Sequence, residues 1–247
     1  MHIKHSLPEQ NVNKISKLKI SCCVSCFLCY DLILRDSLTL YCRCSVSSIH
    51  LHKQLPLCNM ASKPIWWRGR IWARSFCSND NSGKFFCKTA DCGSGEVSCN
   101  GAAAIPPASL AEFTLAADNG MDFYDVSLVD GFNLPLSITP QSGSGSNCTS
   151  TSCPVDLNAI CPQGLAIRDD SGGATIGCKR KFGSPQTCGS PQTCPPTSYS
   201  LYFKNQCRQS YSYAYDDLTS TFTCTGGPNY LITFCPCETR LGFWGLA

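Results

Sequence analysis

The stretch Gly83-Lys-Phe-Phe-Cys87-Lys-Thr-Ala-Asp91-Cys92-Gly-Ser-Gly95-Glu-Val-Ser-Cys99 decides the fold. It combines three cysteines, a threonine, an aspartate and several glycines at fixed spacing. The whole chain carries 21 cysteines in 247 residues. Such a density is typical of a disulfide scaffold in an oxidising compartment, because cytosolic thiols are kept reduced. The sequence therefore predicts a secreted, disulfide-stapled protein.

Charge and histidine content exclude several classes of function. Residues 64–236 hold eleven Lys or Arg against thirteen Asp or Glu, whereas residues 1–63 hold eight against three. A slightly acidic main segment argues against nucleic-acid binding. All four histidines precede residue 64, so the main segment cannot build a histidine-dependent nucleophile or a histidine-ligated zinc site. We expect no metal and no cofactor.

The pattern after Pro64 is that of a β protein. Short runs rich in β-branched and aromatic residues alternate with Gly, Pro, Ser and Asn turns, which predicts many short strands. The expected strands are 69–74, 111–115, 122–129, 136–139, 220–224 and 230–234. One helix is expected over about 197–207, where apolar residues recur at helical spacing after two prolines. Frequent turns between short strands favour a β-sandwich.

Residues 1–63 have a different character. Three lysines at 14, 17 and 19 precede the apolar run 20–30, an order that a secretory signal also shows. The run is too short for a membrane span, which needs about 20 residues, and a clear cleavage site is missing. We expect an unassigned extension, either a targeting segment or misjoined sequence, and no stable membrane span.

The stretch 83–99 resembles the signature of the thaumatin-like family of plant pathogenesis-related, antifungal proteins. Further blocks similar to family blocks occur in the family's order at 69–74, 110–115, 122–135, 211–217 and 230–236. The resemblance covers about residues 64–236, roughly 70% of the chain, and does not extend to residues 1–63. It implies a mainly β, thaumatin-like sandwich with two disulfide-rich loop lobes. Because the N-terminal strands of the family are not recognisable here, we expect the sandwich to lack them.

The resemblance also implies boundaries and bridges. The sandwich is expected at 64–74, 108–153 and 208–236, a small loop lobe at 75–107, a cysteine-rich lobe at 154–207 and a tail at 237–247. The implied disulfides are Cys77–Cys87, Cys92–Cys99, Cys148–Cys224, Cys153–Cys207, Cys161–Cys178 and Cys188–Cys194. These use twelve of the thirteen cysteines of 64–236 and leave Cys235, whose counterpart in the family lies near the mature N-terminus.

An acidic cleft is the chemical feature that the resemblance implies. Family members line a cleft between the sandwich and the cysteine-rich lobe with one arginine, one glutamate and three aspartates. The matching positions are Arg70, Glu112, Asp125, Asp130 and Asp216, where Asp217 is an alternative to Asp216. Clustered carboxylates raise one another's pKa and a nearby arginine lowers it, so such a cleft can bind sugar hydroxyls or host an acid/base pair.

Two further motifs are open to more than one interpretation. Aromatic residues near the cleft positions could stack on sugar rings, although strand aromatics more often belong to the core. These residues are Trp72, Phe123, Tyr124 and Phe132. Asn147-Cys148-Thr149 fits an N-glycosylation acceptor, but its central cysteine is expected in a bridge.

Several functions remain compatible with the sequence. The first is a secreted or vacuolar defence protein that binds fungal β-1,3-glucan or another cell-wall polysaccharide. The second is a weak endo-β-1,3-glucanase with Glu112 as acid and Asp125 or Asp130 as its partner; the sequence leaves enzymatic activity open. The third is an inhibitor of microbial hydrolases, and the fourth is a defective or misannotated family member. We expect a monomer from the resemblance.

Overall fold

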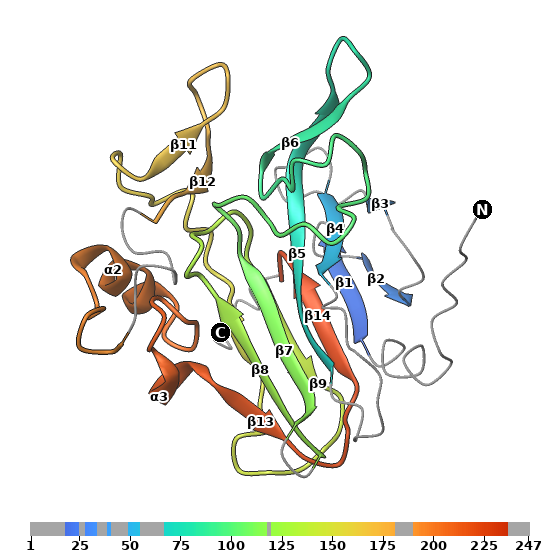
Figure 1. Cartoon of the computed structure of the whole chain (residues 1–247), viewed down its shortest axis with the longest axis vertical. Coiled ribbons are helices and arrows are strands. Elements are labelled where there is room, and N and C mark those ends of the chain that lie inside the picture. Colours follow the sequence, from blue (N-terminus) through green and yellow to red (C-terminus); the bar gives the residue numbers. More distant parts are fainter. Residues whose placement is uncertain are drawn as a thin grey trace, which may run out of the picture.

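The computed structural model describes the backbone of strands at 18–24, 28–33, 39–40 and 49–54, and then residues 67–117, 120–180 and 190–236. Two β-sheets face each other, and helices and loops lie to one side of them (Figure 1). The strands are β1 (Leu18–Val24), β2 (Leu28–Ile33), β3 (Thr39–Leu40), β4 (Ile49–Gln54), β5 (Trp67–Asn79), β6 (Phe85–Thr89), β7 (Leu110–Ala117), β8 (Met121–Ser127), β9 (Leu136–Pro140), β10 (Thr151–Cys153), β11 (Ala166–Arg168), β12 (Thr175–Cys178), β13 (Phe222–Cys224) and β14 (Tyr230–Phe234).

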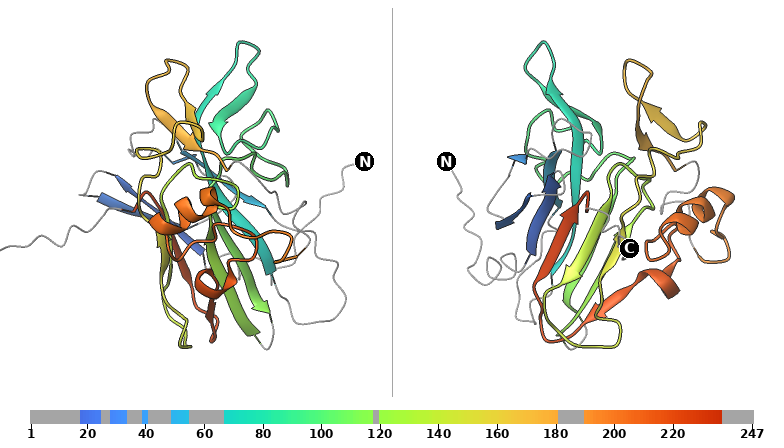
Figure 2. Two further views of the ribbon diagram at one scale, coloured as in Figure 1. Left: turned by 90° about the vertical axis from the view of Figure 1, so that its left-hand side faces the viewer. Right: turned by 180° about the vertical axis from the view of Figure 1, so that it is seen from behind.

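The strand order defines the sandwich. One sheet runs β10-β9-β14-β1-β2, and the other runs β13-β8-β7-β5-β4-β3 with β6 paired to β5. The β11–β12 hairpin and the β5–β6 hairpin project from the same end of the molecule (Figure 2). A strand is confirmed at each expected place, at 69–74, 111–115, 122–129, 136–139, 220–224 and 230–234, although β13 begins at Phe222 rather than Ser220, and the mainly β sandwich is confirmed with them.

The core lies between the two sheets because successive residues of a strand point to opposite faces. Alternate residues of β5, β7 and β8 meet alternate residues of β9 and β14 in one buried cluster. Its members include Ile71, Ala73, Ala111, Phe113, Leu115, Tyr124, Val126, Leu136, Ile138, Tyr230, Ile232 and Phe234. The rings of Tyr124 and Tyr230 contact each other across the sheets with centroids 5.0 Å apart. The opposite face of β5, β7 and β8 is thereby left available for other contacts.

The expectation that the sandwich lacks its N-terminal strands is corrected by the backbone pairing. Strand β1 pairs in parallel with β14, and β4 pairs antiparallel with β5. Without these strands, β14 and β5 would each present an unpaired row of N–H and C=O groups. Backbone pairing does not need the family's side-chain motif, which is why the motif comparison missed it.

Five of the six implied disulfides are confirmed. They are Cys77–Cys87, Cys92–Cys99, Cys148–Cys224, Cys153–Cys207 and Cys161–Cys178. Cys188, one end of the sixth implied bridge, lies outside the described residues. Cys194 and Cys235 are also disulfide-bonded. Cys77–Cys87 links β5 to β6, Cys148–Cys224 links the β9–β10 connection to β13, and each bridge typically contributes about 2–4 kcal/mol.

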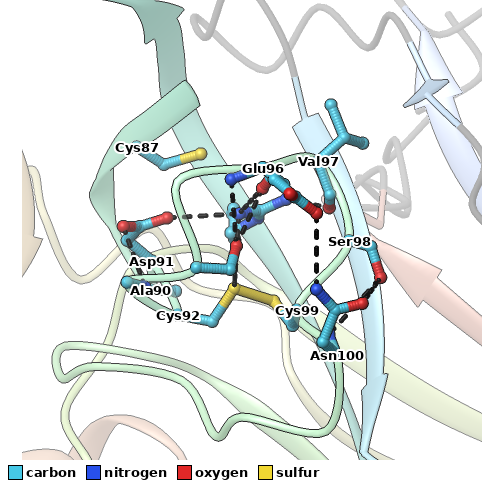
Figure 3. The surroundings of a disulfide bond; sticks show 12 residues. Cys87, Ala90, Asp91, Cys92, Glu96, Val97, Ser98, Cys99 and Asn100 are labelled. Carbon is cyan, nitrogen blue, oxygen red and sulfur yellow. Dashed lines mark hydrogen bonds and ion pairs between the residues drawn. A yellow bond between two sulfur atoms is a disulfide. The ribbon is translucent and has the colours of Figure 1, made fainter. Parts of the chain in front are cut away.

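A fully buried arginine organises the small loop that follows β6. Arg74, on β5, is 0% exposed and its guanidinium donates to the Asp91 carboxylate at 3.2 Å and to the Glu96 carbonyl at 3.3 Å. It also donates to the carbonyl of Val97. Figure 3 shows these loop residues around the Cys92–Cys99 disulfide. The loop therefore closes around one charged side chain, beside a small apolar cluster that Ala90, Cys92 and Cys99 form with Trp72.

The cysteine-rich side of the molecule contains the expected helix. It is α2 (Ser198–Gln206), and the Thr197 hydroxyl accepts a hydrogen bond from the Ser200 backbone N–H at 3.1 Å as its N-terminal cap. A second, one-turn helix, α3 (Asp217–Ser220), was not expected. In the described part of the chain, no helix has the length and apolar character needed to cross a membrane.

Candidate functional site

Three charged residues form a row across the outer face of β5, β7 and β8. Arg70 lies opposite Glu112, and Glu112 lies opposite Asp125 in the backbone register. Residues directly opposite on neighbouring strands have Cβ atoms about 4.5–5.5 Å apart. The sheet therefore brings together three of the five residues that the sequence analysis assigned to the cleft.

The electrostatic environments of the two acids in this row differ. Arg70 Nε donates to Glu112 Oε1 at 2.5 Å, and both side chains are partly exposed. Asp125 Oδ1 is buried and has no hydrogen-bond partner within the described structure. Burial, reinforced by the charge of Glu112, raises the pKa of Asp125 well above its ordinary value, and Arg70 opposes this only in part. The row thus combines an ion-paired carboxylate with a carboxyl group that favours its protonated form.

Asp130 lies in the turn that follows β8. Gly131 N–H donates to the Leu128 carbonyl at 3.0 Å, and the Asp130 carbonyl accepts from Ala108 N–H at 3.1 Å. From the cysteine-rich side, Arg180 donates to the carbonyl of Val129 at 3.2 Å. Burial raises the pKa of Asp130, while the charges of Arg70 and Arg180 oppose that change. This turn adds a second carboxyl group with an elevated pKa to the site.

Tyr211 and Asp217 form the opposite side of the site. The backbone N–H of Tyr211 donates to the Val126 carbonyl at 2.9 Å, and its carbonyl accepts from Leu128 N–H at 2.8 Å. Its hydroxyl donates to Asp217 Oδ1 at 2.7 Å. Burial, together with the bond to Asp217, raises the pKa of the Tyr211 phenol. The loop that carries both side chains is therefore fastened along the edge of β8.

Asp216 does not line the cleft, and its assignment there is corrected to Asp217. Asp216 is only 8% exposed, and its Oδ2 accepts from the Ser212 backbone N–H and hydroxyl, both at 3.0 Å. It also forms an ion pair with Lys204 of α2 at 2.9 Å. Asp216 therefore satisfies buried donors inside the 210–220 loop, while its neighbour faces the open space.

These side chains line a cleft of about 860 Å³. Its lining contains four carboxyl groups, two guanidinium groups and three aromatic residues among small and apolar residues, and one of the three, Phe113, is also part of the buried core. The functional side chains in it are Arg68, Arg70, Glu112, Phe123, Asp125, Asp130, Tyr211 and Asp217. Apolar loop residues Ala104 and Pro106 close one side. The space is within the range of small-molecule sites, about 300–1,000 Å³.

The four aromatic candidates separate into one cleft residue and three buried residues. Phe123 lines the cleft. Trp72, Tyr124 and Phe132 are each at most 1% exposed and belong to the interior. The Trp72 indole N–H donates to the Ala90 carbonyl at 3.1 Å, which anchors the small loop rather than a ligand.

Two cleft residues were missed by the sequence analysis. Arg68 precedes Arg70 by two positions on β5, so the period of two in a strand could have identified it. Tyr211 lies in a loop, where no periodicity indicates the direction of a side chain. Within the described residues, no group of three or more His, Cys, Asp or Glu side chains is arranged to hold a metal ion.

Comparison with known proteins places these features in context. A family model described as "Thaumatin family" matches residues 51–236, beginning before residue 64. Thaumatin-like protein 1 of Pyrus pyrifolia is 61% identical over 184 residues, covering 69% of this chain and 72% of that protein. A glucan endo-1,3-beta-glucosidase of Prunus avium is 59% identical over 181 residues, covering 70% and 73%. Among solved structures, the thaumatin-like xylanase inhibitor TLXI matches with a TM-score of 0.39 and 19% identity, covering 89% of this chain and 99% of that one.

Proposed function

The chain belongs to the thaumatin family, and from this we propose that it is a secreted plant defence protein whose acidic cleft binds fungal β-1,3-glucan and thereby has an antifungal effect. The five disulfides of the described residues support secretion, because such bridges persist in oxidising compartments.

The buried Oδ1 of Asp125 is the observation that carries this proposal. A buried polar atom without a partner costs about 1–3 kcal/mol, and a ligand hydroxyl that reaches it recovers part of that free energy. Sugar hydroxyls both donate and accept, so they suit Asp125 in either protonation state. The rings of Phe123 and Tyr211 offer apolar surfaces to the same ligand. Four carboxyl groups against two guanidinium groups disfavour polyanions, which leaves a neutral polysaccharide as the better partner.

Replacing Asp125 by valine is expected to weaken binding to insoluble β-1,3-glucan by about 5- to 150-fold, the equivalent of about 1–3 kcal/mol. Valine suits the strand and occupies similar space, but it leaves a bound sugar hydroxyl without a partner. Co-sedimentation with the glucan, with cellulose in parallel, measures the effect. Asp170→Asn is the matched control, because Asp170 lies on the β11–β12 hairpin and is 87% exposed.

The folding of this variant can be judged from its pH dependence. Because the pKa of Asp125 is raised in the folded state, wild-type stability falls as the pH rises above the unfolded value of about 4. Asp125→Val removes that loss, so at pH 7 it should be at least as stable as wild type. Equal glucan affinity of a folded Asp125→Val and wild type would contradict the proposed role of the cleft.

Glycoside hydrolysis is a second candidate, favoured by the two acids of the Arg70–Glu112–Asp125 row. Retaining and inverting enzymes both need one protonated and one ionised carboxyl group beside the scissile bond. In this second candidate the buried Asp125 supplies the proton and Glu112, ion-paired with Arg70, is its partner, the reverse of the assignment made from the sequence. The relative named glucan endo-1,3-beta-glucosidase supports testing this activity.

Glu112→Gln distinguishes binding from hydrolysis. The amide keeps a hydrogen-bonding side chain opposite Asp125, so glucan binding should survive. Release of reducing sugar should fall by at least about 100-fold, because an amide cannot exchange protons or act as a carboxylate nucleophile. Unchanged product formation in this variant would eliminate the enzyme hypothesis. Inhibition of microbial hydrolases stays a prediction of the resemblance, since the cleft chemistry does not bear on it.

A further inference from the structure

We propose that Asn147 is a site of N-linked glycosylation. Asn147-Cys148-Thr149 is the only Asn-X-Ser/Thr sequence in the 247 residues. Such a sequence is an acceptor in secreted proteins when the middle residue is not proline. The proposal does not depend on the cleft, because it concerns a covalent modification of the mature protein.

The folded structure presents Asn147 at the surface. The residue is exposed and lies in the connection between β9 and β10. A turn shapes this connection: Ser144 and Thr225 exchange backbone hydrogen bonds at 3.1 and 2.9 Å, and Cys148 N–H donates to the Gly145 carbonyl at 3.1 Å. A glycan attached here would project from a loop rather than displace core side chains.

Among the residues that the structure describes, the Asn147 side chain makes one hydrogen bond, and that bond is compatible with the modification. Its Nδ2 donates to the Thr221 carbonyl at 2.8 Å. A side-chain amide carries two N–H donors, and glycosylation replaces only one of them. The remaining N–H can keep the bond to Thr221, so the attached sugar and the folded loop do not compete for the same hydrogen.

The covalent step needs a lipid-linked oligosaccharide diphosphate as co-reactant. Asn147 Nδ2 forms a bond to the anomeric carbon of the first N-acetylglucosamine. The bond from that carbon to the phosphate oxygen breaks, and the lipid diphosphate leaves with the bonding electron pair. Nδ2 loses one proton, so the asparagine side chain becomes a substituted amide and no oxidation or reduction occurs.

The cysteine inside the acceptor sequence is the apparent obstacle, and its bridge shows why it need not be one. Cys148 pairs with Cys224, 76 residues later in the chain. A chain that enters the secretory compartment N-terminus first exposes Asn147 well before Cys224 arrives. During that interval the acceptor is extended and unbridged, so glycosylation precedes closure of the disulfide.

The test is the mass of the protein from plant cells. The full chain, directed into the secretory pathway by a cleavable signal, should carry a mass above that of the oxidised polypeptide. A peptide N-glycosidase active on plant glycans should remove the excess and leave aspartate at position 147. Thr149→Ser keeps the acceptor and should stay glycosylated, whereas Thr149→Ala and Asn147→Gln should lose the excess.

A bare polypeptide mass for wild type, in cells that glycosylate a control acceptor protein, would overturn the proposal. Because attachment precedes folding, retained protein in a whole-cell extract gives the same answer as secreted protein. The measurement involves no glucan, so its failure and the failure of the proposed function are distinguishable.

Discussion

Arg74→Met is expected to lower the free energy of unfolding by about 3–5 kcal/mol, the usual cost of removing one partner of a buried ion pair. The guanidinium is 0% exposed, lies 3.2 Å from the Asp91 carboxylate and lies 4.7 Å from the centre of the Phe85 ring. It also satisfies the carbonyls of Glu96 and Val97. Methionine has a similar length but no donors, so the partly exposed Asp91 carboxylate and the two carbonyls lose this partner.

Urea unfolding measures this loss, with Arg168→Met as the matched control. Arg168 is exposed and donates to the Gly173 carbonyl at 3.3 Å, so its replacement should change the free energy of unfolding by less than about 0.5 kcal/mol. The loss of unfolding free energy in Arg74→Lys should lie between the losses in Arg74→Met and Arg168→Met, because lysine keeps the charge but lacks the planar guanidinium. A loss below about 1 kcal/mol in Arg74→Met would show that water replaces the guanidinium in this loop.

Gly131→Ala is expected to lower the free energy of unfolding by about 2–5 kcal/mol. Left-handed backbone strain accounts for about 1–2 kcal/mol of this loss, and overpacking accounts for about 1–3 kcal/mol. Gly131 has φ +88°, and an added Cβ would lie 2.7 Å from the Cys178 carbonyl oxygen and 3.0 Å from Pro107 Cβ. The backbone must shift to relieve these contacts. Because Asp130 is the preceding residue, glucan affinity should fall together with stability.

Comparison with Gly83→Ala separates the cost of overpacking from the cost of left-handed backbone strain. Gly83 has φ +83°, and nothing lies within 4 Å of an added Cβ. It should therefore lose only the strain, about 1–2 kcal/mol. Thermal unfolding of both variants, with glucan co-sedimentation below their transitions, gives the comparison. Equal losses in the two variants would contradict a steric role for the contact between Gly131 and the Cys178 carbonyl.

The sandwich was predictable because its signals are local. Period-two runs such as 230–234 form strands wherever one face is buried, and the confirmed helix follows Thr197, a residue type that favours the N-cap position. Disulfide connectivity is not local, and only the family resemblance supplied the five confirmed pairs. The N-terminal strands were missed because their pairing depends on open edges of β5 and β14, which exist only in the assembled sheets.

The site was predictable in residue type but not in arrangement. Arg70, Glu112 and Asp125 came from the resemblance, yet their alignment in one row depends on the register of three strands. The choice between Asp216 and Asp217 depends on the contacts of Asp216 with Lys204 and Ser212. A loop sequence has no periodicity from which these contacts could be predicted. The burial of Asp125 Oδ1, on which the proposed reversal of the acid and its partner rests, is a property of tertiary packing.

Strand β14 is the last of the described strands, yet it lies inside its sheet between β9 and β1, the first of the described strands. Residues 18–22 must meet residues 230–234 before that sheet is continuous, and pairing over such a distance in the sequence raises the contact order of the fold. Proteins dominated by such distant pairings fold in about milliseconds to seconds, far more slowly than helical bundles. The sheet therefore stays incomplete until β14 has been synthesised, and a truncation that removes β14 should leave an aggregation-prone fragment rather than a smaller working domain.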